Sequence, residues 1–124
     1  MAEGFARTYG RDVIEAASAG LCAASAVAAE TIQAMSEKNI DLSAYSPKSL
    51  RSLSTRTFDL AVNLSGFALP DVAAGEVIEW EIPDPVGCGI ETHRQVRDQI
   101  ENRVMGLILD LRRKTRSRSS AADP

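Results

Sequence analysis

The sequence lacks the features that mark membrane-spanning, secreted and metal-binding proteins. It contains no apolar run of the roughly 18 residues that a transmembrane helix needs, and its N-terminus lacks the basic-then-apolar pattern of a signal peptide. Its two cysteines, Cys22 and Cys88, have neither metal-ligand spacing nor the density of a disulfide scaffold. We therefore expect a cytoplasmic protein with reduced thiols, no membrane contact, and no metal or other cofactor.

Charge is distributed unevenly along the 124 residues. The net charge is −3, but residues 112–118 supply five of the 14 positive charges, so residues 1–111 carry a net charge of −7. We expect one α/β domain over residues 1–113 and a basic, disordered tail over residues 114–124. A basic tail can contact nucleic acid or acidic lipid. Because the acidic body opposes polyanion binding, we expect no nucleic-acid partner.

Helical and strand-like patterns alternate along the chain. Apolar residues at steps of three and four predict helices, and runs rich in β-branched and aromatic residues predict strands. The expected helices cover residues 2–9, 25–38 and 92–111, and the expected strands cover residues 13–17, 58–64 and 77–82. Strands that alternate with helices predict a parallel sheet with helical crossovers, although three strands are few for such a sheet. The second strand looks largely buried.

Local signals indicate where these helices begin and end. Gly10 ends the first helix, Ser25 can cap the second, and Asn39 suits the left-handed residue that closes it. Thr92 and Gln95 match a capping box for the last helix. That helix carries an apolar face, which we expect to lie on the sheet, formed by Val96, Ile100, Val104, Leu107, Ile108 and Leu111.

One acid stands out at the end of a strand. Asp84 lies between Pro83 and Pro85, and each proline fixes its own φ and restricts the residue before it. In open α/β sheets, ligands bind at the carboxyl ends of the strands. From spacing alone, an ordinary aspartate in a proline-flanked turn is the simpler interpretation.

Cys88 and Arg94 match a cysteine–five residues–arginine pattern between a strand and a helix. Residues 83–87 separate the cysteine from its strand, and Glu91 inside the pattern would repel a phosphate. We interpret the pair as a loop cysteine and a helix-surface arginine. The single histidine, His93, is interpreted as a solvated first-turn residue. Cys22 is either a small buried hydrophobe or a redox partner of Cys88.

A set of short stretches, taken in order, resembles one family. They are residues 1–7 (Met-Ala-Glu-Gly-Phe-Ala-Arg), 15–21 (Glu-Ala-Ala-Ser-Ala-Gly-Leu), 40–43 (Ile-Asp-Leu-Ser), 46–50 (Ser-Pro-Lys-Ser-Leu), 58–64 (Phe-Asp-Leu-Ala-Val-Asn-Leu), 83–85 (Pro-Asp-Pro) and 94–100 (Arg-Gln-Val-Arg-Asp-Gln-Ile). The family they resemble is that of the low-molecular-weight protein tyrosine phosphatases, with the related thioredoxin-coupled arsenate reductases. Each stretch is weak alone, but the ordered set covers nearly the whole chain.

The resemblance implies a three-layer α/β fold with a parallel sheet. It also implies that Asp84 is the general acid, which protonates the departing oxygen. Family members open with a central strand that ends in a cysteine–five residues–arginine loop, and this loop binds phosphate and leads into the first helix. Met1 corresponds to a position inside that helix, so the sequence as written lacks both the strand and the loop. We therefore expect a catalytically inactive protein that forms homo-oligomers through unpaired sheet edges.

Two alternatives stay open. In the first, the chain is a fragment of an active phosphatase or arsenate reductase, and its start is misplaced. The restored parent protein would then act on a phosphorylated substrate or on arsenate. In the second, the chain is a non-enzymatic, self-associating interaction module. Residues 64–66 (Leu-Ser-Gly) lack the resolving cysteine of the thioredoxin-coupled reductases, which argues against that class. Val86 and Gly87 stand where many of the phosphatases have tyrosines, which argues against a preference for phosphotyrosine.

Overall fold

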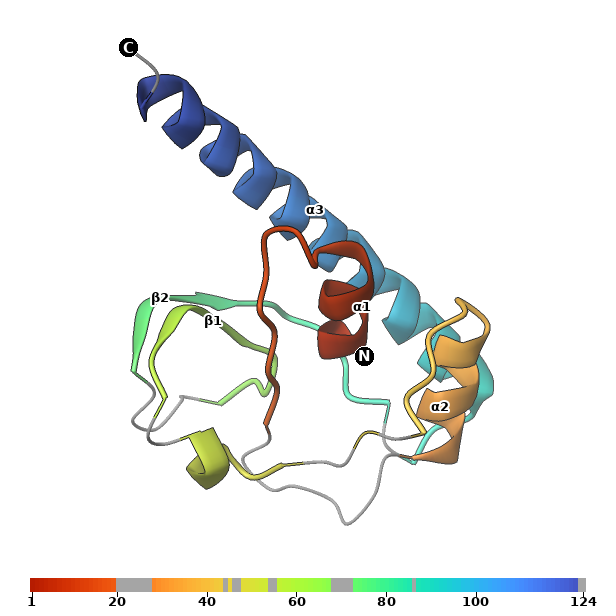
Figure 1. Ribbon diagram of the computed structural model, residues 1–124. Coiled ribbons are helices and arrows are strands. Elements are labelled where there is room, and N and C mark those ends of the chain that lie inside the picture. Colours follow the sequence, from red (N-terminus) through yellow and green to blue (C-terminus); the bar gives the residue numbers. More distant parts are fainter. Residues whose placement is uncertain are drawn as a thin grey trace.

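The computed structural model describes residues 1–19, 28–43, 45, 48–53, 56–67, 73–85 and 87–122, with the backbone alone for residues 51 and 116–122. Its elements, in chain order, are α1 (Ala2–Tyr9), α2 (Ala29–Ser36), the 3-10 helix η1 (Leu50–Leu53), β1 (Phe58–Asn63), β2 (Ala74–Glu79) and α3 (Ile90–Ala122). Both α1 and α2 pack against α3. The two strands lie on one side of α1 and α2 lies on the other (Figure 1). None of the described helices combines the length and apolar character needed to cross a bilayer.

The core forms where α1, α2 and the segment after α2 meet α3. Its buried hydrophobic side chains are Phe5, Met35, Ile40, Leu42, Val96, Ile100, Val104 and Ile108. The predicted apolar face of α3 is therefore confirmed for four residues at steps of four, while Leu107 and Leu111 are half-buried. This face packs mainly on the other helices, and Trp80 and Ile82 reach its edge from the segment after β2.

Two of the predicted helix ends are confirmed. α1 has the predicted bounds, and the N–H of Gly10 donates to Ala6 O at 2.9 Å, which satisfies one of the last carbonyls of the helix. Asn39 has φ 62°, the left-handed conformation expected of a residue that closes a helical segment. Ser25 lies outside the described residues, and α2 begins at Ala29.

The capping box expected at Thr92 and Gln95 is wrong. α3 begins at Ile90, directly after Gly89, so both residues lie inside the helix. At its other end α3 continues to Ala122, through residues that we expected to form a disordered tail. The backbone over residues 114–122 is thus helical, whereas the division of the chain at residue 113 stays a prediction.

The sheet is parallel, as predicted, and contains two strands within the described residues. β1 and β2 pair from Phe58 with Ala74 to Asn63 with Glu79. Only Asn63 is buried in β1, which contradicts the expectation of a largely buried strand. β2 both starts and ends three residues before the predicted range of 77–82.

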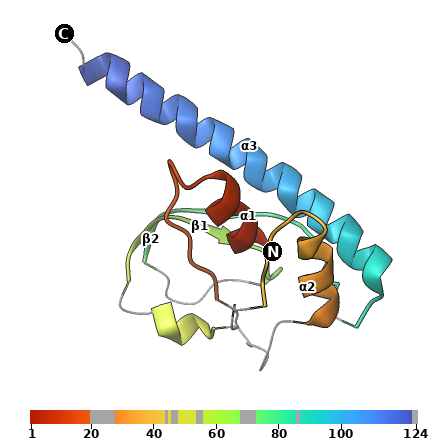
Figure 2. The ribbon, with the colours of Figure 1, turned by 45° about the vertical axis from the view of Figure 1, so that its right-hand side comes forward.

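The strand expected over residues 13–17 is wrong. The N–H groups of Val13 and Ile14 both donate to Gly10 O, at 3.0 and 2.8 Å, which closes a turn where the strand was expected to begin. The carbonyl of Ala16 accepts from the Arg7 guanidinium at 3.1 Å. A strand needs a second backbone beside it to satisfy its donors and acceptors, and no described strand pairs with this segment. Figure 2 shows the segment descending from α1 in front of the sheet.

Candidate active site

A cavity of about 840 Å³ opens beside the carboxyl ends of both strands. Its walls come from the start of α1, from the end of β1 with the residues after it, and from residues 79–85 at and after the end of β2. Val96 and Ile100 of α3 and Thr31 of α2 complete the lining. The carboxyl end of a parallel sheet is the usual position for a ligand site, so this cavity is the candidate active site of the described structure.

Asp84 lines this cavity, in the proline-flanked loop that follows β2. The side chain is exposed, as an acid that exchanges protons with solvent or substrate would be. Its position fits the acid loop that the sequence predicted, and its role as a general acid stays a prediction.

The cavity lining is acidic. Asp84 shares it with Glu79 and Glu81, and none of the described lining residues is a lysine, arginine, histidine or cysteine. The cationic group present is the α-ammonium of Met1, and burial lowers its pKa, an effect that the nearby Glu3 charge partly offsets. An oxyanion site needs positively charged or N–H donor groups aimed at the charge. The described side chains of this lining therefore disfavour phosphate and arsenate.

Asn63 organises the loop at the end of β1. Its Oδ1 accepts from the N–H of Ser65 at 3.0 Å and from Ser65 Oγ at 2.7 Å. Its Nδ2 donates to Phe67 O at 2.6 Å and to Glu79 Oε1 at 3.3 Å. Only 4% of Asn63 is exposed. The bonds fix the residues that follow β1 along the cavity wall, and the sequence analysis did not identify this role, because it treated Asn63 as one more strand residue.

The Cys88–Arg94 pair does not form a phosphate-binding loop. Arg94 lies on α3 and donates to Glu37 of α2 from Nε at 3.0 Å and from Nη2 at 2.7 Å, and it also pairs with Glu91. Cys88 is exposed in the preceding loop, and its N–H donates to Pro85 O at 2.9 Å. These are the positions expected of a loop cysteine and a helix-surface arginine. Cys22 lies outside the described residues.

His93 is buried, which corrects its interpretation as a solvated residue. It is 1% exposed, and its Nδ1 lies 2.9 Å from Gly89 O. The physical reason is helical spacing. His93 precedes Val96, Arg97 and Ile100 by three, four and seven residues, so it shares the buried face of α3. That spacing was visible in the sequence and would have predicted the burial.

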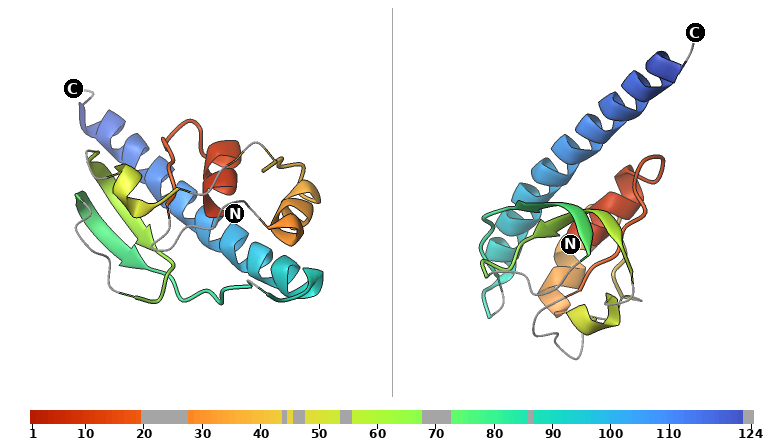
Figure 3. Two further views of the ribbon diagram at one scale, coloured as in Figure 1. Left: turned by 90° about the horizontal axis from the view of Figure 1, so that it is seen from below. Right: turned by 90° about the vertical axis from the view of Figure 1, so that its left-hand side faces the viewer.

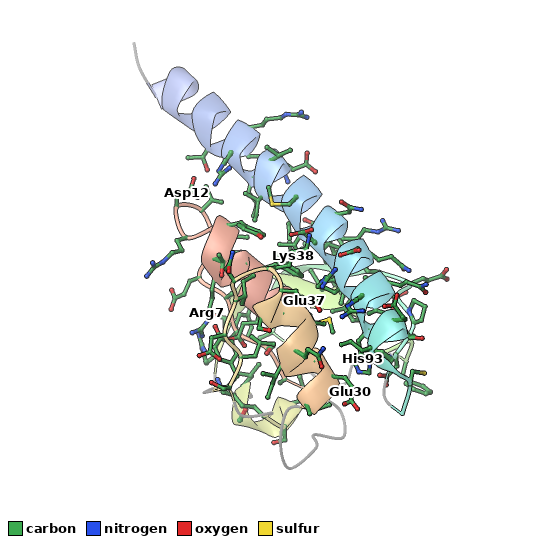
Figure 4. The ribbon with its side chains drawn as sticks, turned by 90° about the vertical axis from the view of Figure 1, so that its right-hand side faces the viewer. Arg7, Asp12, Glu30, Glu37, Lys38 and His93 are labelled. Carbon is green, nitrogen blue, oxygen red and sulfur yellow. The ribbon has the colours of Figure 1, made fainter. Side chains whose placement is uncertain are left out.

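Arg97 is a second buried polar residue that the sequence analysis missed. It is 8% exposed and donates from Nη1 to Ala34 O at 3.0 Å and to Glu37 Oε1 at 2.6 Å. Hydrogen bonds from Arg94, and then from Arg97, lower the pKa of Glu37 to about 2. Figure 4 shows Glu37 at the end of α2 that faces α3. This cluster joins the two helices, and its residues are not among the described residues that line the cavity.

No group of three or more His, Cys, Asp or Glu side chains within the described part of the chain is placed to hold a metal ion. The site geometry thus combines an acid loop, an anchored loop after β1 and an acidic cavity between them.

Comparison with known proteins agrees with this arrangement. The family model described as low molecular weight phosphotyrosine protein phosphatase matches residues 1–117. A protein of Synechocystis sp. named glutaredoxin arsenate reductase is 35% identical over 112 residues, which cover 87% of this chain and 85% of that protein. A putative arsenate reductase of Halobacterium salinarum is 30% identical over 97 residues, which cover 77% of this chain and 68% of that protein.

Comparison with solved structures also finds proteins described as arsenate reductases. A structure described as an arsenate reductase in the phosphate binding state matches with a TM-score of 0.79 at 33% identity, over 89% of this chain and 86% of that one. The arsenate reductase of Archaeoglobus fulgidus matches with a TM-score of 0.72 at 26% identity, over 86% of both chains. The fold, the order of the motifs and these similarities lead to one conclusion: the chain belongs to the low molecular weight phosphotyrosine protein phosphatase family.

Proposed function

We propose that this chain supplies the acid-loop side of an arsenate reductase site, with Asp84 as the general acid. We further propose that residues 1–124 by themselves neither reduce arsenate nor hydrolyse phosphomonoesters. The observation that carries both parts is the lining of the cavity, which contains Asp84 and two further carboxylates but no thiol or guanidinium among its described residues.

The chemistry explains why an acid alone does not suffice. A thiolate attacks the arsenic or phosphorus atom, an oxygen leaves, and a neighbouring acid donates the proton that this oxygen requires. The negative charge that develops must be stabilised by N–H donors or cations. Asp84 can supply the proton, and we propose that the nucleophile and the anion-binding groups enter the cavity on another segment, of the cysteine–five residues–arginine type.

Two features support placing that segment in the same cavity. The start of α1 forms part of the wall, and an anion-binding loop that leads into a helix places its bound oxyanion at the helix N-terminus. Such a loop would also add positive charge to a cavity whose described lining contains Glu79, Glu81 and Asp84.

The source of electrons follows from the comparisons and from one departure in the sequence. Reduction of arsenate to arsenite takes two electrons, which thiols can supply. Residues 64–66 lack a cysteine, so the chain has no resolving thiol at that position. Because a relative at 35% identity is named glutaredoxin arsenate reductase, we propose glutaredoxin as the reductant of the completed enzyme.

The test compares the 124-residue chain with a version completed by a strand and a cysteine–five residues–arginine loop of the family type, taken first from the reading frame upstream of Met1. Both are assayed for arsenate reduction with glutaredoxin and glutathione, and for hydrolysis of p-nitrophenyl phosphate. The 124-residue chain should be inactive and the completed one active. In the latter, Asp84→Asn should lower turnover about a hundredfold or more, the scale expected for a lost general acid.

Two variants of the completed enzyme serve as controls. Glu81→Gln removes a carboxylate from the same cavity without touching the proposed acid, and should change turnover far less than Asp84→Asn. Cys88→Ser should change nothing. Turnover by the 124-residue chain that disappears with Cys88→Ser would overturn the proposal, since the Cys88 loop would then be the active site.

A further inference from the structure

Acidic residues dominate the strands and the segments around them. From Thr57 to His93 the sequence contains no lysine or arginine. The same stretch contains seven acids, which are Asp59, Asp71, Glu76, Glu79, Glu81, Asp84 and Glu91. We use the name acidic sheet surface for four exposed residues of this stretch, Asp59, Val77, Glu79 and Glu81. Side chains two residues apart along a strand share a face, so Val77 and Glu79 of β2 point to the same side.

This surface also has an exposed apolar side chain. Val77 is 50% exposed and pairs with Ala61, while Glu79 pairs with Asn63. An apolar side chain between carboxylates suits a partner with an apolar side chain between cations.

The end of α3 has the complementary character. Arg112 makes the last described hydrogen bonds between α3 and the body. It donates to Asp12 Oδ2 at 2.9 Å and to Tyr9 O at 2.9 Å. Beyond it, the helix projects past α1 into open space (Figure 3). Residues 113–118 add four positive charges to the sequence and no negative one. We call residues 109–118 the basic helix end.

The basic helix end begins with an exposed apolar residue. Leu109 is 48% exposed, and Arg113 follows it after one turn of helix, so the two share a face. The side chain of Arg113 is 77% exposed, and its nearest acid, Asp110, lies 3.9 Å away on the same helix. An exposed ion pair of this kind contributes little, so Arg113 is available to a second molecule.

We propose that the basic helix end of one copy docks on the acidic sheet surface of a second copy. Leu109 would contact Val77, and the cations around Leu109 would face the carboxylates around Val77. The contact cannot form within one chain, because α3 is a continuous helix whose end lies away from its own strands (Figure 1). A polyanion is a poorer occupant of the basic helix end, because residues 1–111 carry a net charge of −7 and would repel it.

The size of the contact sets its strength. The ten residues of the basic helix end span about 15 Å, so one such contact buries far less than the roughly 1,600 Å² of a standard interface. The association should therefore be weak, dependent on protein concentration, and strongly weakened by salt, because exposed charges are screened within about 10 Å at 0.1 M ionic strength.

Sedimentation velocity on the 124-residue chain tests the proposal through a charge swap. The wild-type chain should form dimers or larger species at about 0.05 M salt and dissociate at about 0.5 M salt. A helix variant, Arg113→Glu with Lys114→Glu, and a sheet variant, Asp59→Lys with Glu81→Lys, should each be monomeric at low salt. Mixed in equal amounts, the two variants should associate again, because the reversed charges complement each other.

A matched control and four outcomes decide the result. Arg103→Glu changes an exposed cation of α3 outside the basic helix end and should leave association intact. Circular dichroism confirms that each variant is folded. The proposal fails if the wild-type chain is monomeric at low salt, if the helix variant still associates through strand edges, or if the mixed variants do not associate. It also fails if the wild-type chain stays monomeric and binds a DNA duplex or vesicles of anionic lipid.

Discussion

Replacing Ile108 by alanine should remove a contact that holds the end of α1 on α3. Ile108 is fully buried, and a Cβ atom built on Gly10 would lie 3.0 Å from both its Cδ1 and its Cγ1. The substitution deletes the three carbons beyond Cβ. At about 0.8 kcal/mol per carbon, the transfer contribution is about 2.4 kcal/mol, and the residual cavity should raise the loss of unfolding free energy to about 3–4 kcal/mol.

The contact with Gly10 permits a sharper test than one variant. Gly10→Ala alone should cost about 1–3 kcal/mol, because its methyl group would overlap Ile108. Gly10 has φ −119°, which alanine can adopt, so the cost is one of packing and not of backbone strain. In the Ile108→Ala background the overlap with Ile108 is gone and the new methyl group enters the vacated space, so only its close approach of 3.1 Å to Ala6 O remains. The double variant should therefore be more stable than the sum of the single effects predicts, by about 1–2 kcal/mol.

Urea unfolding, followed by circular dichroism at high salt to keep the chain monomeric, measures these differences. Leu109→Ala is the matched control, since Leu109 is the neighbouring residue on the same helix and is 48% exposed, and it should cost less than about 1 kcal/mol. If Ile108→Ala does not fold, Ile108→Val takes its place with a cost of about 0.5–1.5 kcal/mol. Additive single effects, or equal costs at Ile108 and Leu109, would refute the described packing of α1 on α3.

Three further predictions concern side chains outside the core. Hydrogen bonds from Arg94 and Arg97 lower the pKa of Glu37 from 4.5 to about 2, so the stability that Glu37 contributes is complete above pH 4.5 and is lost as the pH falls toward 2. Glu37→Gln should therefore flatten the pH dependence of the unfolding free energy, measured in urea, between these two values. An unchanged pH dependence would contradict the pairing. Asn63→Ala should lower the unfolding free energy by about 1–3 kcal/mol, because its buried bonds to Ser65 and Phe67 are lost; a smaller loss would show that water replaces them. Cys88 should react with a thiol reagent at the rate of an ordinary exposed thiol, since Arg94 pairs with glutamates. A faster reaction would favour the Cys88–Arg94 pattern as an active-site loop.

The sequence predicted those parts of the fold that depend on neighbours along the chain. The bounds of α1, the left-handed Asn39 and the buried face of α3 all follow from residue type and helical spacing. The family followed from motifs in a fixed order, and the position of Asp84 followed from its place after a strand and between two prolines. A helix satisfies its backbone internally, so its sequence alone carries most of the information needed to recognise it.

Only the tertiary structure decided the features that need a distant partner. A strand depends on another backbone for its hydrogen bonds, and residues 13–17, which find no such partner among the described strands, form a turn and an irregular segment instead. Arg97 is buried because Ala34 and Glu37, some 60 residues earlier in the chain, accept its hydrogen bonds. Likewise, the cavity itself exists because the fold brings the start of α1 and the ends of both strands together, although its three carboxylates lie within the short stretch of residues 79–84. Local spacing encodes which residues can form an element, whereas the free energy of strand pairing, ion pairing and burial depends on what the fold places beside them.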